Sequence, residues 1–173
     1  METIDILNQK GIKKIEMRKL LVDAITGGSF SLEEIESASD SLKDKQIATV
    51  LEAIEAVSGQ KTAVLDVAYL TFAKRFILSE NNSCKREASR IVGNMAADYP
   101  DELGDVIPVL LQNTRDSGTV VRWGSAYALA RIILLEKYKN SELVQTVREI
   151  YEAEQESGVK NQYAKALKRI KAI

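Results

Sequence analysis

Several residue types are scarce in this chain of 173 residues, and each shortage excludes a class of protein. Without any histidine, the chain cannot build a histidine general base, a Ser-His-Asp or Cys-His arrangement, or an ordinary zinc site. A single cysteine cannot form an intramolecular disulfide, which excludes a disulfide-stapled secreted scaffold. We therefore expect a non-catalytic protein that uses no metal and no cofactor.

Long apolar runs and a leader-like beginning are also missing. No apolar stretch approaches the roughly 20 residues that a membrane span needs. The first five residues, METID, lack the basic-then-apolar profile of a signal peptide. With 45% apolar and 28% charged residues, the composition is that of a folded domain of ordinary size. These features predict a single cytoplasmic domain over residues 1–173, with no membrane segment.

Only two prolines, nine glycines and 6% aromatic residues favour helices over strands. Apolar residues recur at steps of three and four, as in Ile47, Val50, Leu51, Ile54 and Val57, and no segment alternates as a strand would. The sequence therefore predicts an all-α fold. The expected helices span about 12–26, 31–39, 43–57, 62–79, 83–98, 102–115, 120–137, 141–155 and 159–172.

Capping and breaking residues set several of these boundaries. Ser31 and Glu34 are spaced as a capping box, in which the hydroxyl and the carboxylate each accept a first-turn amide. The glycines at 27–28 predict a break before it. The Tyr-Pro pair at 99–100 predicts the end of one helix, and Asp101 is the expected N-cap of the next.

The second half of the chain repeats itself with a period near 38 residues. Segment 121–132 (VRWGSAYALARI) matches 159–170 (VKNQYAKALKRI) at a shift of 38, and it matches 84–95 (CKREASRIVGNM) at a shift of 37. A fainter fourth copy aligns Ile54 with Val92. Self-similarity at such a period indicates helical hairpins that stack to form one continuous core.

Two positions within these copies predict tight packing. Gly93 inside a helix costs about 1 kcal/mol relative to alanine, which a need for close approach of two helices would explain. Cys84 stands where the other copies have Val121 and Val159. We therefore expect Cys84 to be a buried core residue and not a reactive thiol.

Segment 105–129 carries a proline in its first helix, Pro108, and then Asp116 and Arg122, six residues apart, at the turn between helices. In these features it resembles a HEAT repeat. The resemblance covers residues 45–173, is clearest in 83–173, and is weak in the divergent residues 1–40. It implies a right-handed α-α superhelix of about four HEAT-like helical hairpins with extra N-terminal helices. It also implies that Asp116 and Arg122 bridge neighbouring turns.

The neighbouring units depart from the family pattern at the two turn positions. Ser79 and Lys85 stand there in the unit before, and Glu154 and Lys160 in the unit after. The main alternative, a tetratricopeptide repeat, has a period of about 34 residues. Its tryptophan, glycine and tyrosine pattern is not present. The HEAT resemblance therefore predicts a fold and leaves the function open.

Charge is divided unevenly between the predicted first and second helices of each hairpin. Segments 101–116 and 141–156 carry net charges of −3 and −4, whereas 83–98, 120–139 and 159–173 carry +1, +3 and +5. The resemblance implies that the second helices line a concave side, which would be a basic groove with two aromatic residues at its centre. The residues expected to bind a partner there are Arg86, Arg90, Trp123, Tyr127, Arg131, Lys165 and Arg169, with Asn94 and Asn161 on the same stripes.

This surface predicts a non-catalytic binding or scaffold module that recognises an acidic protein or peptide. The alternative is a nucleic-acid-binding HEAT-like protein related to DNA alkylbase glycosylases, with parts for Trp123, Arg90 and Arg131. No aspartate falls on the expected stripe, and an isoelectric point near 5.7 is low for a dedicated nucleic-acid protein. Assembly with another copy or another chain is a third function, and the oligomeric state stays open. The charges as an ordinary solvated face, and the aromatic residues as partly packed, remain simpler interpretations.

Overall fold

A computed structural model describes residues 2–173 and confirms the all-α prediction. Within this range it has ten α-helices, one 3-10 helix and no strand. None of these helices combines the length and the apolar character that crossing a bilayer requires. The elements are α1 (Thr3–Asn8), α2 (Lys14–Thr26), α3 (Leu32–Ala38), α4 (Asp44–Gln60), α5 (Val67–Lys74), α6 (Asn82–Met95), η1 (Pro100–Glu102), α7 (Ile107–Asn113), α8 (Thr119–Ile132), α9 (Glu142–Ala153) and α10 (Ser157–Arg169).

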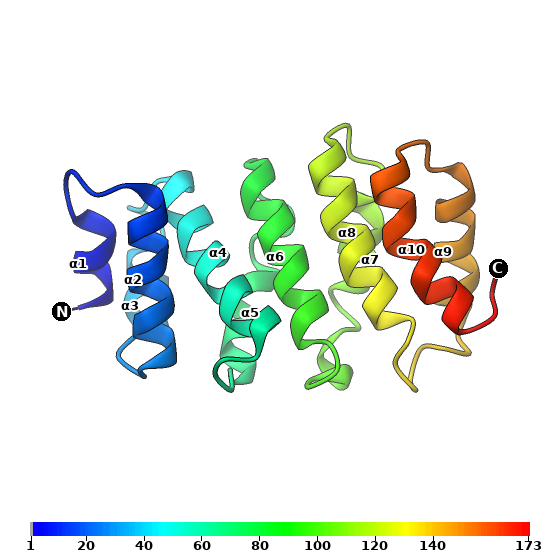
Figure 1. Ribbon diagram of the computed structural model, residues 1–173, viewed down its shortest axis with the longest axis horizontal. Coiled ribbons are helices and arrows are strands. Elements are labelled where there is room, and N and C mark those ends of the chain that lie inside the picture. The colour runs from blue at the N-terminus through cyan, green and yellow to red at the C-terminus, as the bar shows by residue number, and fades with distance from the viewer. Residues whose placement is uncertain (1) are drawn as a thin grey trace.

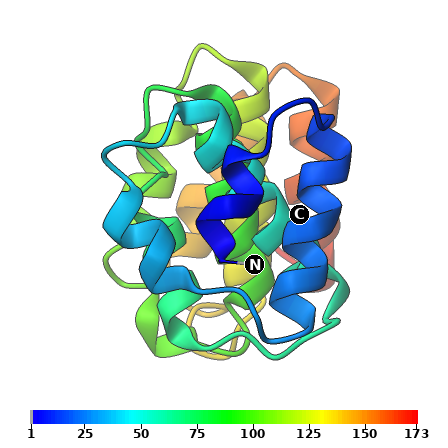
Figure 2. The same cartoon turned by 90° about the vertical axis from the view of Figure 1, so that its left-hand side faces the viewer.

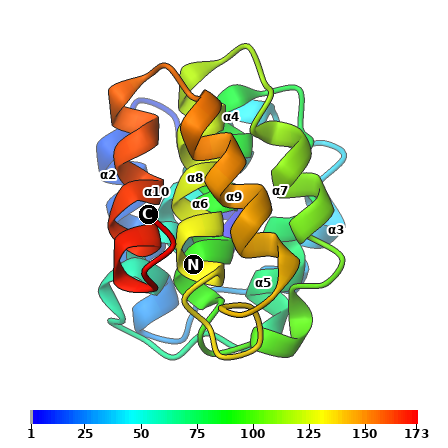
Figure 3. The ribbon, with the colours of Figure 1, turned by 90° about the vertical axis from the view of Figure 1, so that its right-hand side faces the viewer.

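From α2 onward the helices form two layers, with the odd-numbered helices in one and the even-numbered helices in the other (Figure 1), and α1 packs on both α2 and α3 at the N-terminal end of the row. Figure 2 and Figure 3, which look along the row from its two ends, show the layers side by side. In the even layer, α2 packs on α4, α4 on α6, α6 on α8, and α8 on α10. The helices α6, α8 and α10 also pack on the odd helix before them. The termini lie at opposite ends of the row, and most contacts between helices join adjacent hairpins.

The closest approach in the even layer is between α6 and α8. A Cβ atom on Gly93 would lie 3.0 Å from the Cα of Ala128 and 3.0 Å from the ring of Tyr127. On the facing helix, a Cβ on Gly124 would lie 3.1 Å from the Cα of Arg86. Both glycines are therefore needed for the helices to touch at this distance, as the sequence predicted for Gly93.

The buried position of Cys84 is also confirmed. Cys84, Val121 and Val159, which share one position in the repeat, are at most 1% exposed. Burial raises the pKa of the Cys84 thiol to about 11, and the carboxylate of Asp44 adds to the shift. The thiol group donates to the backbone oxygen of Asp44 at 3.6 Å. Cys84 is therefore a protonated core residue at neutral pH.

Two expected helices are wrong at their beginnings, and the helix expected over 120–137 ends earlier, at Ile132. Instead of a helix over 62–79, only α5 is helical, because Lys61 ends α4 in the left-handed region, with φ of 55°, and an extended segment follows. The Tyr99 hydroxyl donates to the oxygen of Leu65 at 2.8 Å and fixes that segment. In the second case, Asp101 lies in η1 and does not cap the next helix, since α7 begins only at Ile107.

The capping box is half correct. The Ser31 hydroxyl accepts from the Glu34 N–H at 3.2 Å, as expected. The Glu34 carboxylate does not return to Ser31, but accepts from the N–H of Ile4 at 3.3 Å. The Ser31 N–H donates instead to the Thr3 hydroxyl at 2.7 Å. Both replacement partners belong to α1, a helix that the sequence analysis did not predict.

Charged side chains link successive turns along one edge of the even layer. The Asp116 carboxylate pairs with Lys85 at 2.8 Å, and Arg122 pairs with Glu154 at 3.0 Å. Each pair joins a cation near the start of one even helix to a carboxylate in the turn of the next hairpin. Arg122 also donates to the backbone oxygen of Asp116. The expected bridging by Asp116 and Arg122 is confirmed, and Lys85 and Glu154, which depart from the family pattern, supply the partners.

The same turn is built three times. Ser79, Asp116 and Glu154 each accept a hydrogen bond from the backbone N–H two residues further on, at 3.1, 2.7 and 2.9 Å. The three side chains are 37 and 38 residues apart, which is the period found in the sequence. The hydrogen bond from Lys85 lowers the pKa of Asp116. Burial alone would raise the pKa of Glu154, but hydrogen bonds from Arg122 and from backbone amides lower it.

Candidate functional site

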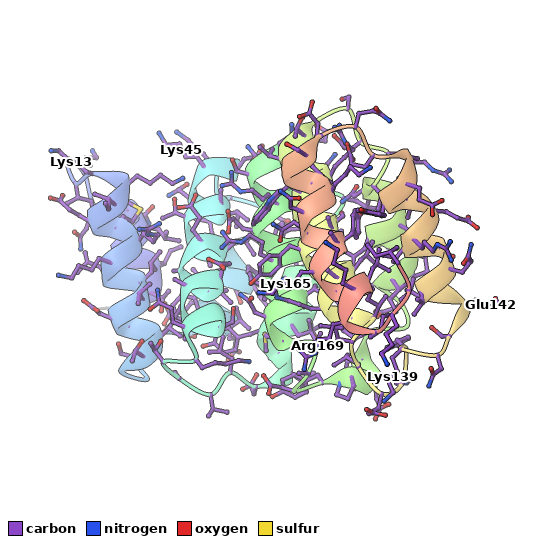
Figure 4. The ribbon with its side chains drawn as sticks, turned by 45° about the vertical axis from the view of Figure 1, so that its right-hand side comes forward. Lys13, Lys45, Lys139, Glu142, Lys165 and Arg169 are labelled. Atoms are coloured by element: carbon purple, nitrogen blue, oxygen red, sulfur yellow. The ribbon has the colours of Figure 1, made fainter. Side chains whose placement is uncertain are left out.

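The residues predicted to bind a partner lie on three consecutive even helices. Helix α6 carries Arg86 and Arg90, α8 carries Trp123, Tyr127 and Arg131, and α10 carries Lys165 and Arg169. Figure 4 shows Lys165 part-way along α10 and Arg169 near its end. The structure brings the α6 and α8 residues into direct contact, as described below, whereas the two α10 residues are exposed and separate.

An aromatic and guanidinium stack forms the centre of the site. The ring centroids of Trp123 and Tyr127 are 5.5 Å apart, and both side chains are half-buried. The Arg90 guanidinium lies 5.5 Å from each of these centroids. Arg131 lies over the Tyr127 ring at 3.3 Å and donates to the Tyr127 backbone oxygen at 3.1 Å. Cation–π attraction therefore holds two arginines against the rings.

A series of hydrogen bonds connects the Tyr127 hydroxyl to α4 and holds the ring in place. This hydroxyl donates to Asn94 Oδ1 at 2.5 Å, and Asn94 Nδ2 donates to the Ser58 hydroxyl at 3.1 Å. Asn94 is 9% exposed, so its expected place on the open stripe is wrong. A buried amide must be hydrogen-bonded to avoid a desolvation cost, and here it serves to orient the tyrosine.

The expectation that the centre of the groove is basic is wrong for Arg86 and Arg90. Arg86 pairs with Glu87 at 2.7 Å, while Arg90 pairs with Glu87 at 3.3 Å and with Glu55 at 2.8 Å. Two carboxylates therefore balance two guanidinium groups. Burial raises the pKa of Glu55, although Arg90 acts in the opposite direction. The cations are held in place by these pairs, and their charge is compensated.

Glu55 is part of the site although no motif predicts it, because it lies on α4, outside the three clearest repeats. The faint fourth copy does not identify it either, since the shift that aligns Ile54 with Val92 aligns Glu52, and not Glu55, with Arg90. Glu52 itself pairs with Lys14 of α2 at 2.5 Å.

A hollow of about 840 Å³ opens beside the stack, between α2 and α8. Arg90 and Tyr127 line it, together with Glu55 of α4 and with one carboxylate and two cations of α2, namely Glu16, Arg18 and Lys19. The two α2 cations were not predicted, because the resemblance was weak in residues 1–40. The hollow thus joins the predicted stack to the N-terminal hairpin.

Uncompensated positive charge flanks the neutral centre. Within residues 2–173, five cations on this face make no ion pair: Arg18, Lys19, Arg131, Lys165 and Arg169. Helix α10 contains three lysines, one arginine and no carboxylate, while its partner α9 contains three carboxylates and one arginine. Burial lowers the pKa of Arg131, but a guanidinium stays charged at neutral pH.

No model of a known protein family matches the chain, and no curated protein sequence is significantly similar to it. Over the part of the chain that the structure describes, no group of three or more Cys, Asp or Glu side chains is placed to hold a metal ion. The face of the even helices thus offers fixed guanidinium groups, partly covered aromatic rings and unpaired cations, of which Arg90, Tyr127, Arg18 and Lys19 line the hollow.

Proposed function

We propose that this chain is a non-catalytic binding or scaffold module, built of HEAT-like helical hairpins in a right-handed superhelix. Its ligand is an acidic segment of a protein partner. This segment lies in the predicted groove, on the face of the even helices that points away from the odd helices. The two layers and the turn pairs Lys85–Asp116 and Arg122–Glu154 support the architecture. The unpaired cations on α2, α8 and α10 carry the functional proposal, because they attract and orient carboxylates.

Nucleic acid is the alternative ligand, and the aromatic stack argues against it. Proteins that bind single strands stack bases on open aromatic faces. Here the guanidinium groups of Arg90 and Arg131 lie over the rings of Trp123 and Tyr127. Carboxylates that bind guanidinium groups need no open ring, so an acidic peptide fits this arrangement better.

Trp123, the one tryptophan of the chain, provides a direct readout of binding. A glutamate-rich peptide is titrated while the tryptophan fluorescence is followed between about 50 and 200 mM salt. We expect saturable binding that weakens with salt. The double reversal Lys165→Glu, Arg169→Glu should weaken it by about tenfold or more, because exposed cations without partners are replaced by anions.

Arg148→Glu is the control, compared with the single change Arg169→Glu so that the charge difference is equal, since Arg148 is an exposed arginine on α9 in the other layer. This control should bind the peptide like the unmodified chain. Equal weakening by both changes, or no weakening by the double reversal, would remove this face from the proposal. A single-stranded oligonucleotide that binds where the peptide does not would establish the nucleic-acid alternative instead.

A further inference from the structure

A second cavity, of about 760 Å³, lies at the edge of the molecule where the even helices begin. The connection between α1 and α2 forms one wall, the start of α4 forms another, and Asn81 and Ser83 at the start of α6 close a third. This cavity contains none of the residues of the stack or of the hollow beside it. It is therefore a separate site.

The charge around this cavity is of one sign. Four lysines line it, and no aspartate or glutamate does; they are Lys10, Lys14, Lys43 and Lys45. Lys14 pairs with Glu52, but the other three make no ion pair within residues 2–173. The arginines beside the hollow differ, because Glu55 and Glu87 compensate Arg90. Among the described residues, this cavity therefore faces three unpaired lysines and no carboxylate.

The lysines also occupy positions that helices disfavour. Lys43 is the N-cap of α4 and Lys45 lies in its first turn, where the helix dipole is positive and repels a cation, whereas Asp44 between them has the favourable sign. Lys13 is likewise the N-cap of α2. Other helices of the chain use the favoured side chains, with Ser31 capping α3 and Asn81 capping α6. Residues that break a local rule at one place are typical of a functional site.

The remaining walls indicate what kind of anion fits. Leu7, Ile12, Met17 and Ala48 provide apolar surface, and Asn81 provides the amino group of its side chain, since its Oδ1 caps α6. The volume is within the range of about 300–1,000 Å³ found for small-molecule sites. We propose that the cavity binds a phosphorylated small molecule. Lys10, Lys43 and Lys45 bind its phosphate groups, and Ile12 and Met17 contact its less polar part.

Isothermal titration calorimetry with ATP, pyrophosphate and adenosine tests the proposal on the full chain. ATP supplies both parts of the ligand, pyrophosphate only the anion and adenosine only the body. We expect ATP to bind more tightly than either of the others, and its affinity to fall with salt. In the double variant Lys43→Gln, Lys45→Gln, the ATP affinity should fall by about tenfold or more, since two charge-assisted contacts are lost.

Lys139→Gln is the control, because Lys139 is also a lysine but lies at the opposite edge from Lys45 (Figure 4). It should bind ATP normally. Without ligand, the double variant should melt at the same temperature as the unmodified chain or higher, because its change relieves repulsion at a helix N-terminus. Unfolding would then not explain lost binding.

Failure of both ATP and pyrophosphate to bind at about 50 mM salt overturns the proposal. An equal loss in the Lys139 variant, or pyrophosphate binding as tight as that of ATP, overturns it as well. An oligonucleotide that depends on Lys43 and Lys45 when ATP does not bind would show a polymer site in place of a small-molecule site. None of these outcomes bears on the acidic-peptide proposal, which Trp123 fluorescence reports separately.

Discussion

Gly93 and Gly124 determine how closely α6 and α8 pack, and so where the aromatic rings of the site lie. Glycine inside a helix is unfavourable by about 1 kcal/mol against alanine. At position 93 glycine is needed because the Cα of Ala128 and the ring of Tyr127 occupy the space that a side chain would fill. Gly93 therefore weakens its own helix, α6, but determines where Tyr127 of the neighbouring helix α8 lies.

We predict that Gly93→Ala destabilises the chain although it improves helix propensity. The added methyl group meets backbone at 3.0 Å, which cannot give way as a flexible side chain would. Overpacking of this kind costs about 1–3 kcal/mol, against about 1 kcal/mol gained in propensity. Urea unfolding should therefore show a net loss of about 1 kcal/mol.

Gly158→Ala provides the comparison. Gly158 lies in the first turn of a helix, α10, and a Cβ atom there would meet nothing within 4 Å. This change should stabilise the chain by about 0.5–1 kcal/mol. If both alanine variants are more stable than the unmodified chain, the contact between α6 and α8 has room for the methyl group at position 93.

At the scale of the elements, the turns of successive hairpins are joined by charge pairs with different members. Lys85 and Asp116 form one pair, and Arg122 and Glu154 form the next. The identity of the cation and of the carboxylate changes while the sign is kept. A sequence pattern that requires aspartate and arginine at the two turn positions matches only the unit with Asp116 and Arg122. A pattern that requires only the sign of the charge also includes their partners Lys85 and Glu154 in the neighbouring units.

The Asp116 pair predicts a pH-dependent contribution to stability. Its pKa is lowered in the folded chain by the hydrogen bond from Lys85, so its contribution is complete above the unfolded pKa of about 3.9. The contribution is lost as the pH falls through the lowered folded pKa. We therefore expect Asp116→Asn to cost about 1–3 kcal/mol at neutral pH and much less in strong acid, as measured by urea unfolding at each pH.

Asp101→Asn is the control for that series. Asp101 also pairs with a lysine, Lys137, but its side chain is 85% exposed and the pair is screened by water. The control should cost less than about 1 kcal/mol at either pH. An Asp116→Asn variant that loses the same stability in acid as at neutral pH would show that the charge of Asp116 contributes nothing.

Local sequence predicted the long helices well and the short ones poorly. Helix α1 has six residues, too few for an apolar period to be recognised. It is held by tertiary hydrogen bonds from Ser31 to Thr3 and from Ile4 to Glu34. For the same reason only half of the capping box could be predicted: the Glu34 partner comes from a segment about 30 residues away, which no local rule contains.

For the whole molecule, the sequence identified which helices carry the candidate site but not its net charge. The repeat aligned Arg90 with Tyr127 closely enough to predict that they share a face. The charge depends on Glu55, which reaches Arg90 from the preceding hairpin. A net charge per helix does not distinguish charged groups that form ion pairs from those that do not. It therefore treats Arg86 and Arg90 as unpaired cations, although both form ion pairs. Only the packing of neighbouring hairpins separates compensated from uncompensated cations.

The row of helices makes stability depend on position. Helix α6 has neighbours on both sides in the even layer, and nine of its 14 residues are buried. Helix α8 is similar, with eight of 14 buried. Near the ends of the row, α2 buries three of 13 residues and α9 one of 12. Where each hairpin is stabilised by its neighbours, the ends open more easily than the middle.

Hydrogen exchange followed by mass spectrometry measures this gradient directly. We predict the slowest amide exchange in α6 and α8, because opening either helix breaks the contacts of both neighbours. Exchange should be faster in α2 and α9, and fastest in α3, which buries only Ile35. The rates are compared with those expected for the unfolded chain, so that differences in sequence do not enter. Equal protection in all helices would instead indicate one cooperative unit, in which the terminal hairpins are as stable as the centre and the site near Tyr127 gains nothing from its central position.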